Sequence, residues 1–167
     1  MKRLWFIGES AVLAAADQSL KSYARENIKP GEEKPLTKHI VLRNVRNRGL
    51  FLNLLQEKPG VVKKLSLASA LALTAAQGAA LAGKGHFFRK NALALLLAGA
   101  WSNTFDRIAG DGVTDYIGVK SGGKKLSEIT YNLADFYILA GNAILALTSI
   151  FPAGKRKNTK KRENVVS

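Results

Sequence analysis

The sequence predicts a mainly α-helical integral membrane protein with four transmembrane helices and a small extracytoplasmic β-rich platform after the first helix. Four long apolar blocks carry almost no charge. Short segments rich in Lys and Arg lie between and beside these blocks. Polar residues, including several carboxylates, gather where the blocks end. This distribution is typical of a helical bundle in a bilayer rather than of a soluble domain.

The apolar blocks approach the ~20 residues that a helix needs to cross about 30 Å of hydrocarbon. They cover residues 4–20, 65–82, 91–105 and 131–151. The second block has no charged residue, and Asp135 alone interrupts the fourth. Ala, Leu and Gly dominate the blocks, and small residues let membrane helices approach closely. We therefore predict four crossings within a single transmembrane domain.

The first block has an alternative interpretation. Lys2 and Arg3, an apolar stretch and three alanines at 14–16 are also typical of a secretory signal peptide. Three apolar blocks would remain after cleavage, which favours a transmembrane helix. Glu9 lies inside this block, and we expect it to face the bundle or to reach the interface.

Basic residues near the helix ends predict the orientation. They occur before the first block, in the connector 83–90 and in the segment 153–167. Four crossings place these three segments on one side, which we predict to be cytoplasmic. Residues 1–152 are thus assigned to the transmembrane domain and 153–167 to a basic cytoplasmic tail.

The extracytoplasmic platform is predicted at about residues 25–60. The apolar runs 40–42 (Ile-Val-Leu) and 50–52 (Leu-Phe-Leu) predict two short strands around a turn at Arg48-Gly49. A second polar segment, 107–130, should lie on the same outer side.

Charge and composition exclude several functional classes. The net charge of +14, from 26 basic and 12 acidic residues, fits a nucleic acid or an anionic membrane surface as partner. The apolar blocks favour the membrane, whereas a soluble nucleic-acid-binding protein would need no detergent for extraction. Cysteine is absent, which excludes disulfides and a thiol nucleophile. His39 and His86 are the only histidines and lie far apart, so neither a histidine-based metal site nor a Ser-His-Asp triad is expected.

Ionisable residues at the outer block ends are costly in a membrane and need partners or a task. Asp17 and Lys21 are four residues apart, so they share a helix face and can pair. Asn103, Asp106 and Arg107 likewise share one face of the third block. We expect Arg107 to keep Asp106 ionised, which suits a structural role.

Two further carboxylates form a candidate catalytic pair. Asp115 lies in the apolar stretch 113–117, and Asp135 follows Asn132 by three residues near the outer end of the fourth block. Two close carboxylates share one proton, so one can activate water while the other protonates the substrate. Salt bridges or helix capping are the alternative roles for each aspartate alone.

In this order along the chain, five motifs resemble those of lipoprotein signal peptidase, also called signal peptidase II. They are residues 17–21 (DQSLK), 47–49 (NRG), 103–107 (NTFDR), 113–116 (VTDY) and 131–135 (YNLAD). The resemblance covers most of the chain from residue 4 to residue 151. It implies a multi-pass enzyme of the bacterial cytoplasmic membrane with a β-cradle after its first helix.

The resemblance also implies an activity and a site. Such an aspartyl endopeptidase uses two aspartates and no cofactor or metal, and it cleaves prolipoprotein signal peptides before a diacylglyceryl-modified cysteine. Its expected partners are these signal peptides and membrane lipids, not nucleic acid. Asp115 and Asp135 match the catalytic aspartates. The residues matching the family's supporting or substrate-binding positions are Asp17, Lys21, Asn47, Gly49, Asn103, Asp106, Arg107 and Asn132.

The chain departs from the family pattern at a few positions. Arg48 stands where threonine is usual, and Ser102 stands where glycine is usual. Leu50 and Asp111 are also atypical. These positions surround the cradle and groove, so they bear on substrate fit more than on the carboxylates. The alternative is a divergent or inactive membrane paralogue with a scaffold or binding role.

Overall fold

The computed structural model describes residues 2–50, 54–84, 86–110, 112–120 and 129–150. The predicted tail 153–167, the atypical Asp111 and most of the apolar run 50–52 lie outside these residues. The described chain is mostly helical and contains one small antiparallel sheet. Its elements are α1 (Lys2–Asn27), β1 (Lys34–Pro35), β2 (Ile40–Asn47), α2 (Pro59–Ala82), α3 (Phe87–Ala109), β3 (Val113–Val119), β4 (Thr130–Tyr131) and α5 (Leu133–Ile150).

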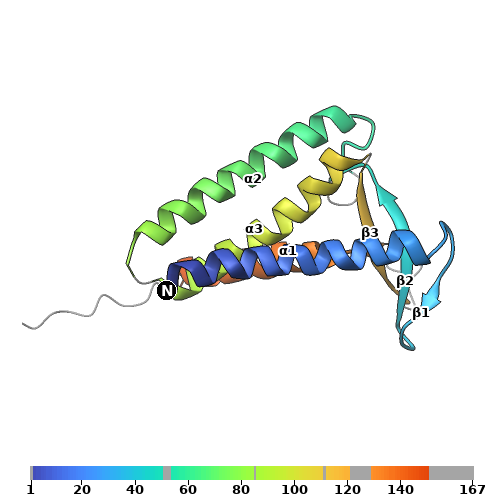
Figure 1. Ribbon diagram of the computed structural model, residues 1–167, viewed down its shortest axis with the longest axis horizontal. Coiled ribbons are helices and arrows are strands. Elements are labelled where there is room, and N and C mark those ends of the chain that lie inside the picture. Colours follow the sequence, from blue (N-terminus) through green and yellow to red (C-terminus); the bar gives the residue numbers. More distant parts are fainter. Residues whose placement is uncertain (1, 51–53, 85, 111, 121–128, 151–167) are drawn as a thin grey trace, which may run out of the picture.

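The helices run lengthwise and the sheet stands across one end of the bundle (Figure 1). Helix α3 is the centre of the bundle, because it packs against α1, α2 and α5. Helix α2 packs along α3, and most of its surface faces away from the bundle. The sheet contacts α1 and α3, so it is fixed to the helix ends from which the polar residues project.

Two glycines allow α3 and α5 to pack closely. A Cβ added at Gly99 would lie 2.5 Å from the carbonyl oxygen of Ala134. A Cβ added at Gly141 would lie 2.8 Å from the carbonyl oxygen of Ala92. Both distances are too short for a side chain, so the absence of one at each position lets the two backbones meet. This contact holds the start of α5 beside the C-terminal half of α3.

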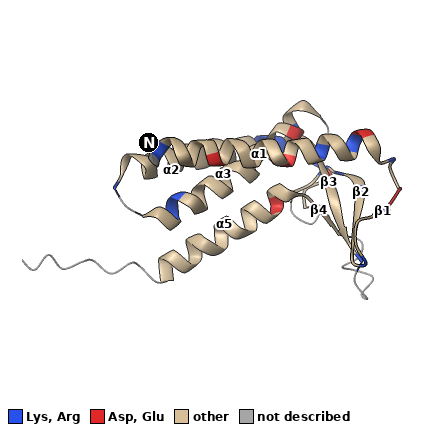
Figure 2. Cartoon of the chain, turned by 60° about the horizontal axis from the view of Figure 1, so that its bottom comes forward, with Lys and Arg blue, Asp and Glu red and all other residues tan. Residues whose placement is uncertain are grey.

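Among the described residues, α2 and α5 are long and apolar enough to cross a membrane. Only 22% of the most apolar window of α2 and 11% of that of α5 is buried in the protein, so their apolar side chains lie largely on the outside. A soluble monomer rarely exposes large apolar surfaces, so the outward faces of α2 and α5 need an apolar environment. Figure 2 shows α5 without Lys or Arg and with acidic colour only near the sheet.

The helices α1 and α3 are as long as α2 but carry ionisable residues at their sheet-facing ends. Helix α1 continues past the predicted boundary at residue 20 to Asn27. Helix α3 ends at Ala109, and the backbone N–H of Gly110 donates to the carbonyl of Asp106. The helices therefore extend beyond their apolar blocks, and the polar ends reach the sheet.

The sheet has the strand order β1-β2-β3-β4, with neighbouring strands antiparallel. The predicted hairpin between residues 40–42 and 50–52 is wrong, because β2 pairs with β1 on one edge and with β3 on the other. Leu50 lies in a bend rather than in a strand. The partner strand β3 comes from the distant segment after α3, which local sequence patterns do not reveal.

Candidate active site

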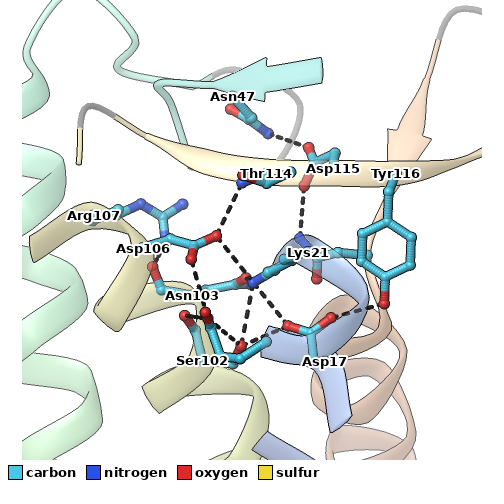
Figure 3. Close-up of polar contacts among 12 residues, drawn as sticks. Asp17, Lys21, Asn47, Ser102, Asn103, Asp106, Arg107, Thr114, Asp115 and Tyr116 are labelled. Atoms are coloured by element: carbon cyan, nitrogen blue, oxygen red, sulfur yellow. Dashed lines mark hydrogen bonds and ion pairs between the residues drawn. The ribbon is translucent and has the colours of Figure 1, made fainter. Parts of the chain in front are cut away.

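Lys21 lies at the centre of a buried polar cluster where α1, α3 and the sheet meet (Figure 3). Its Nζ is 2.8 Å from Asp17 Oδ2, so the predicted i, i+4 ion pair is confirmed. The same atom lies 3.3 Å from Asp106 Oδ2 and donates to Asn103 Oδ1 at 2.8 Å. The side chain of Lys21 is fully buried, and its charge is balanced by two carboxylates, as a buried ammonium requires.

Asp17 connects four elements. Its carboxylate accepts hydrogen bonds from Ser102 Oγ of α3 at 2.6 Å and from the Tyr116 hydroxyl of β3 at 3.0 Å. It also accepts from the backbone N–H of Leu133, the first residue of α5, at 3.0 Å. Together with the ion pair to Lys21, these bonds join α1, α3, β3 and α5 at one point.

The ion-pair partners of Asp106 differ from those expected. They are Lys21, and Arg25 at 3.6 Å, rather than Arg107. Asp106 Oδ2 also accepts from the backbone N–H of Thr114 at 3.0 Å, which ties α3 to β3. Arg107 instead donates to the carbonyl oxygen of Gly49 at 2.8 Å. Asp106 thus links α1, α3 and β3, and Arg107 contacts the segment that follows β2.

Asp115 projects from β3 and is 4% exposed. Asn47 Nδ2 of β2 donates to its Oδ2 at 3.1 Å, and Asn132 Nδ2 donates to its Oδ1 at 2.6 Å. Burial raises the pKa of Asp115 to about 7, and the negative charge of Asp135 is the second cause. The two amide hydrogen bonds and the charge of Lys21 act in the opposite direction.

Asp135 lies in the first turn of α5. Its Oδ1 accepts from Asn103 Nδ2 at 3.1 Å, and its Oδ2 accepts from the backbone N–H of Asn132 at 3.1 Å. In return, Asn132 Oδ1 accepts from the backbone N–H of Asp135 at 3.0 Å. This reciprocal capping fixes the start of the helix. Asn132 therefore contacts both carboxylates, one with its side chain and one with its backbone.

The amide of Asn47 is oriented by its own loop. Its Oδ1 accepts from the backbone N–H of Gly49 at 3.0 Å, which leaves Nδ2 to face Asp115. Opposite this turn, Gly112 has a φ of +135°, and a Cβ there would lie 2.5 Å from the carbonyl oxygen of Asn47. Glycine is required at 112 on both grounds.

The structure brings together all ten site residues named from the sequence, and it adds others. Gln18 Nε2 donates to Asp106 Oδ1 at 3.1 Å, and Ser102 Oγ contacts Asp17 and Lys21. One signal was available: Ser102 precedes Asp106 by four residues and so shares its helix face. Tyr116 and Thr114 gave no such signal, because their side-chain partners lie on other elements that are distant in the sequence.

A cavity of about 240 Å³ lies beside the cluster. Its lining includes Arg107, Gly110 and Gly112, which connect it to the site. Most of the other lining residues lie at the start of α2. Within the described part of the chain, no three His, Asp or Glu side chains gather as metal ligands would. The site offers two carboxylates, Asp115 and Asp135, with amide donors, and such groups suit proton transfer to and from a bound water. The lining residues are Arg48, Pro59, Gly60, Val62, Lys63, Arg107, Gly110 and Gly112.

Comparisons with known proteins agree with one another. Residues 10–151 match the family model described as signal peptidase (SPase) II. A lipoprotein signal peptidase of Methylobacterium radiotolerans is 33% identical over 112 residues, which is 67% of this chain and 64% of that protein. The chain thus spans somewhat less than two thirds of that relative. A lipoprotein signal peptidase of Hydrogenovibrio crunogenus is 28% identical and aligned over 92% of this chain and 91% of its own.

Two solved structures share the fold. Both are described as bacterial membrane enzymes. One superposes with a TM-score of 0.75 at 20% identity and covers 97% of this chain and 94% of its own. The other has a TM-score of 0.73 at 20% identity and covers 89% of this chain.

Proposed function

Because the chain belongs to the signal peptidase II family, we propose that it is an aspartic endopeptidase that removes signal peptides from prolipoproteins. Its substrates are signal peptides followed by a diacylglyceryl-modified cysteine, and it cleaves before that cysteine. The observation that carries the proposal is the contact of Asn132 with both Asp115 and Asp135. Two carboxylates that share one partner residue, one of them buried and the other half-buried, are suited to hold a single proton.

The proposed mechanism follows from this shared proton. Because the pKa of Asp115 is raised to about 7, the pair keeps one proton up to about neutral pH. The ionised carboxylate takes a proton from a water that attacks the scissile carbonyl, while the protonated carboxyl donates to the carbonyl oxygen. The leaving amine is then protonated by the same pair.

The cluster around Lys21 orients the pair without taking part in the chemistry. Lys21 holds Asn103 Oδ1, so the amide nitrogen of Asn103 must face Asp135. Asn47 and Asn132 direct their amide nitrogens to the two oxygens of Asp115. Each carboxylate thus accepts hydrogen bonds on both oxygens, and this fixes its rotamer.

The enzyme is proposed to lie in the bacterial cytoplasmic membrane with four helices crossing it. The outward apolar surfaces of α2 and α5 support this placement. The sheet and polar cluster are at one end of the bundle, and the basic connector between α2 and α3 is at the other (Figures 1 and 2). The positive-inside rule then puts both termini in the cytoplasm and the site at the outer face.

This depth suits a lipid-anchored substrate. The acyl chains of a diacylglyceryl-cysteine can remain in the bilayer while the peptide reaches Asp115 from the outer side. The cavity lined by Arg107 and Gly112 offers space for peptide next to the carboxylate-bearing strand. Residues 1–152 form the peptidase domain in this proposal, and 153–167 form a basic cytoplasmic tail.

Purified protein in detergent, incubated with a diacylglyceryl-modified prolipoprotein, tests the proposal. The wild type should shorten the substrate by its signal peptide, as seen by gel mobility. Asp115→Asn and Asp135→Asn should each lower the rate by at least about 100-fold, since either change removes a member of a unit. Glu26→Gln, an exposed carboxylate on α1, is the matched control. Full activity in either aspartate variant would contradict the proposed catalytic pair, and no cleavage by the wild type would favour the scaffold alternative.

A further inference from the structure

The hydroxyl of Tyr116 connects the two segments that carry the carboxylates. Tyr116 follows Asp115 in β3 and is 3% exposed. Its hydroxyl donates to Asp17 Oδ1 at 3.0 Å and accepts from the backbone N–H of Leu133 at 3.2 Å. Leu133 is the first residue of α5 and directly follows Asn132.

The connection is short. Tyr116 directly follows Asp115 in β3, and one hydrogen bond joins its hydroxyl to the backbone N–H of Leu133. One step back along the chain reaches Asn132, which contacts both Asp115 and Asp135. Any movement of β3 away from the start of α5 must therefore stretch the Tyr116 contacts and the contact between Asn132 and Asp115 together.

We propose that the Tyr116 hydroxyl, held by Asp17, is a positioning group that sets the separation between Asp115 and Asp135. This inference rests on the proposed function, because it assigns a task within the same site. The Tyr116 hydroxyl bonds to Asp17 and Leu133 and acts on Asp115 and Asp135 through Leu133 and Asn132.

Local chemistry keeps this hydroxyl a donor. Asp17 is ion-paired with Lys21 and so offers an ionised acceptor. Burial, and then the charge of Asp17, raise the pKa of Tyr116, so the phenol remains protonated. The ring itself packs with Ala24 and Ile28 in an apolar cluster. Phenylalanine would keep this packing and remove only the hydroxyl.

Tyr116→Phe, compared with Tyr23→Phe at an exposed site on α1, tests the proposal in the full-length protein. We expect kcat to fall about tenfold with an unchanged KM, because a small misplacement of reacting groups lowers the rate without weakening binding. Tyr23→Phe should leave both constants unchanged. An unchanged kcat in Tyr116→Phe would overturn the proposal.

The pH profile separates positioning from a merely structural role. The charged groups that act with Asp115 are Asp135 on α5, Lys21 on α1 and Arg107 on α3. Repulsion from Asp135 affects the pKa of Asp115 more than the Asn132 hydrogen bond does. A wider separation of Asp115 and Asp135 should therefore lower the pKa of Asp115 and move the alkaline limb of the kcat profile to lower pH. A lower melting temperature with an unmoved limb would contradict positioning.

Leu133, whose N–H donates to the Tyr116 hydroxyl, gives an independent test if Tyr116→Phe does not fold. Leu133→Pro removes the N–H that donates to both Tyr116 and Asp17, and proline is well accepted at the first helical position. Leu133→Ala removes the same apolar side chain but keeps the N–H. We expect kcat to fall further in Leu133→Pro than in Leu133→Ala. Equal losses of kcat in the two variants would overturn the inference.

A measurement without substrate distinguishes this inference from the proposed function. The protonated carboxyl band of Asp115, assigned with Asp115→Asn, can be titrated by infrared spectroscopy. If the wild type cleaves nothing, the proposed function fails. A midpoint that moves in Tyr116→Phe would still support the positioning contact, and an unmoved midpoint would overturn it.

Discussion

Asn132 donates a hydrogen bond of 2.6 Å from its side chain to Oδ1 of Asp115. Its backbone N–H meets the other carboxylate, Asp135, at 3.1 Å. These contacts bring a strand and a helix from separate parts of the chain to one residue. The proposed catalytic pair therefore depends on a side chain that has no acid–base chemistry of its own.

Replacement of Asn132 should impair both activity and folding. Asn132→Ala removes the donor to Asp115 and the cap that accepts from the backbone of Asp135. We expect kcat to fall by about 100-fold and stability to fall by about 1 kcal/mol. Peptidase kinetics and thermal unfolding in detergent would measure these effects. Asn142→Ala, exposed on the same helix, should change neither. Wild-type kcat in Asn132→Ala would contradict a role in holding the pair.

The pH dependence of activity should reflect Asp115. Its pKa of about 7 predicts that kcat falls as the pH rises above about 7, because the pair then loses its shared proton. The hydrogen bond from Asn47 favours the ionised form. Asn47→Ala should therefore raise this pKa and move the alkaline limb to higher pH.

Rate profiles of the wild type and Asn47→Ala test this sign. Asn44→Ala is the control on the same strand, since its amide contacts the carbonyl of Ile28 and not the pair. A limb that moves to lower pH in Asn47→Ala would refute the assigned hydrogen bond.

Lys21 should be the most sensitive position for folding. Lys21→Met would leave two buried carboxylates, Asp17 and Asp106, without their shared cation. Breaking a buried ion pair from one side costs about 3–5 kcal/mol. Thermal unfolding should show a large loss of stability in Lys21→Met and little change in Lys64→Met, which alters an exposed lysine of α2. Comparable melting temperatures in the two variants would contradict the central place of Lys21 in the buried polar cluster.

Gly112 tests the backbone geometry beside Asp115. Gly112→Ala introduces a Cβ 2.5 Å from the carbonyl oxygen of Asn47, at a φ of +135°. We expect a loss of about 1–3 kcal/mol from backbone strain and at least a tenfold lower activity as Asn47 shifts. Gly78→Ala on α2 meets no atom within 4 Å and is the control. Wild-type activity in Gly112→Ala would show that the Asn47 contact is dispensable.

Local spacing in the sequence was enough to predict part of the site. The four-residue interval predicted the ion pair of Asp17 and Lys21, which the structure confirms. The three-residue interval of Asn132 and Asp135 predicted one helix face, but α5 begins at Leu133, so Asn132 precedes the helix and caps it. The ion pair depends only on helix geometry, so a single helix contains all the information needed to predict it.

Relationships between distant segments could not be predicted in this way. The pairing of β2 with β3 replaced the expected hairpin, because the partner strand lies beyond two helices. The ion-pair partners of Asp106 are Lys21 and Arg25 from another helix rather than its neighbour Arg107. Tyr116 looked like an apolar neighbour of Asp115, and only the packing of α1 and α5 gives its hydroxyl two polar partners.

The most direct test of the account is mass spectrometry of the products from a diacylglyceryl-modified prolipoprotein. The wild type should yield a fragment whose new N-terminus is the lipid-bearing cysteine, and Asp115→Asn and Asp135→Asn should yield none under the same conditions. Cleavage at that bond by either variant at the wild-type rate would contradict a catalytic pair formed by Asp115 and Asp135.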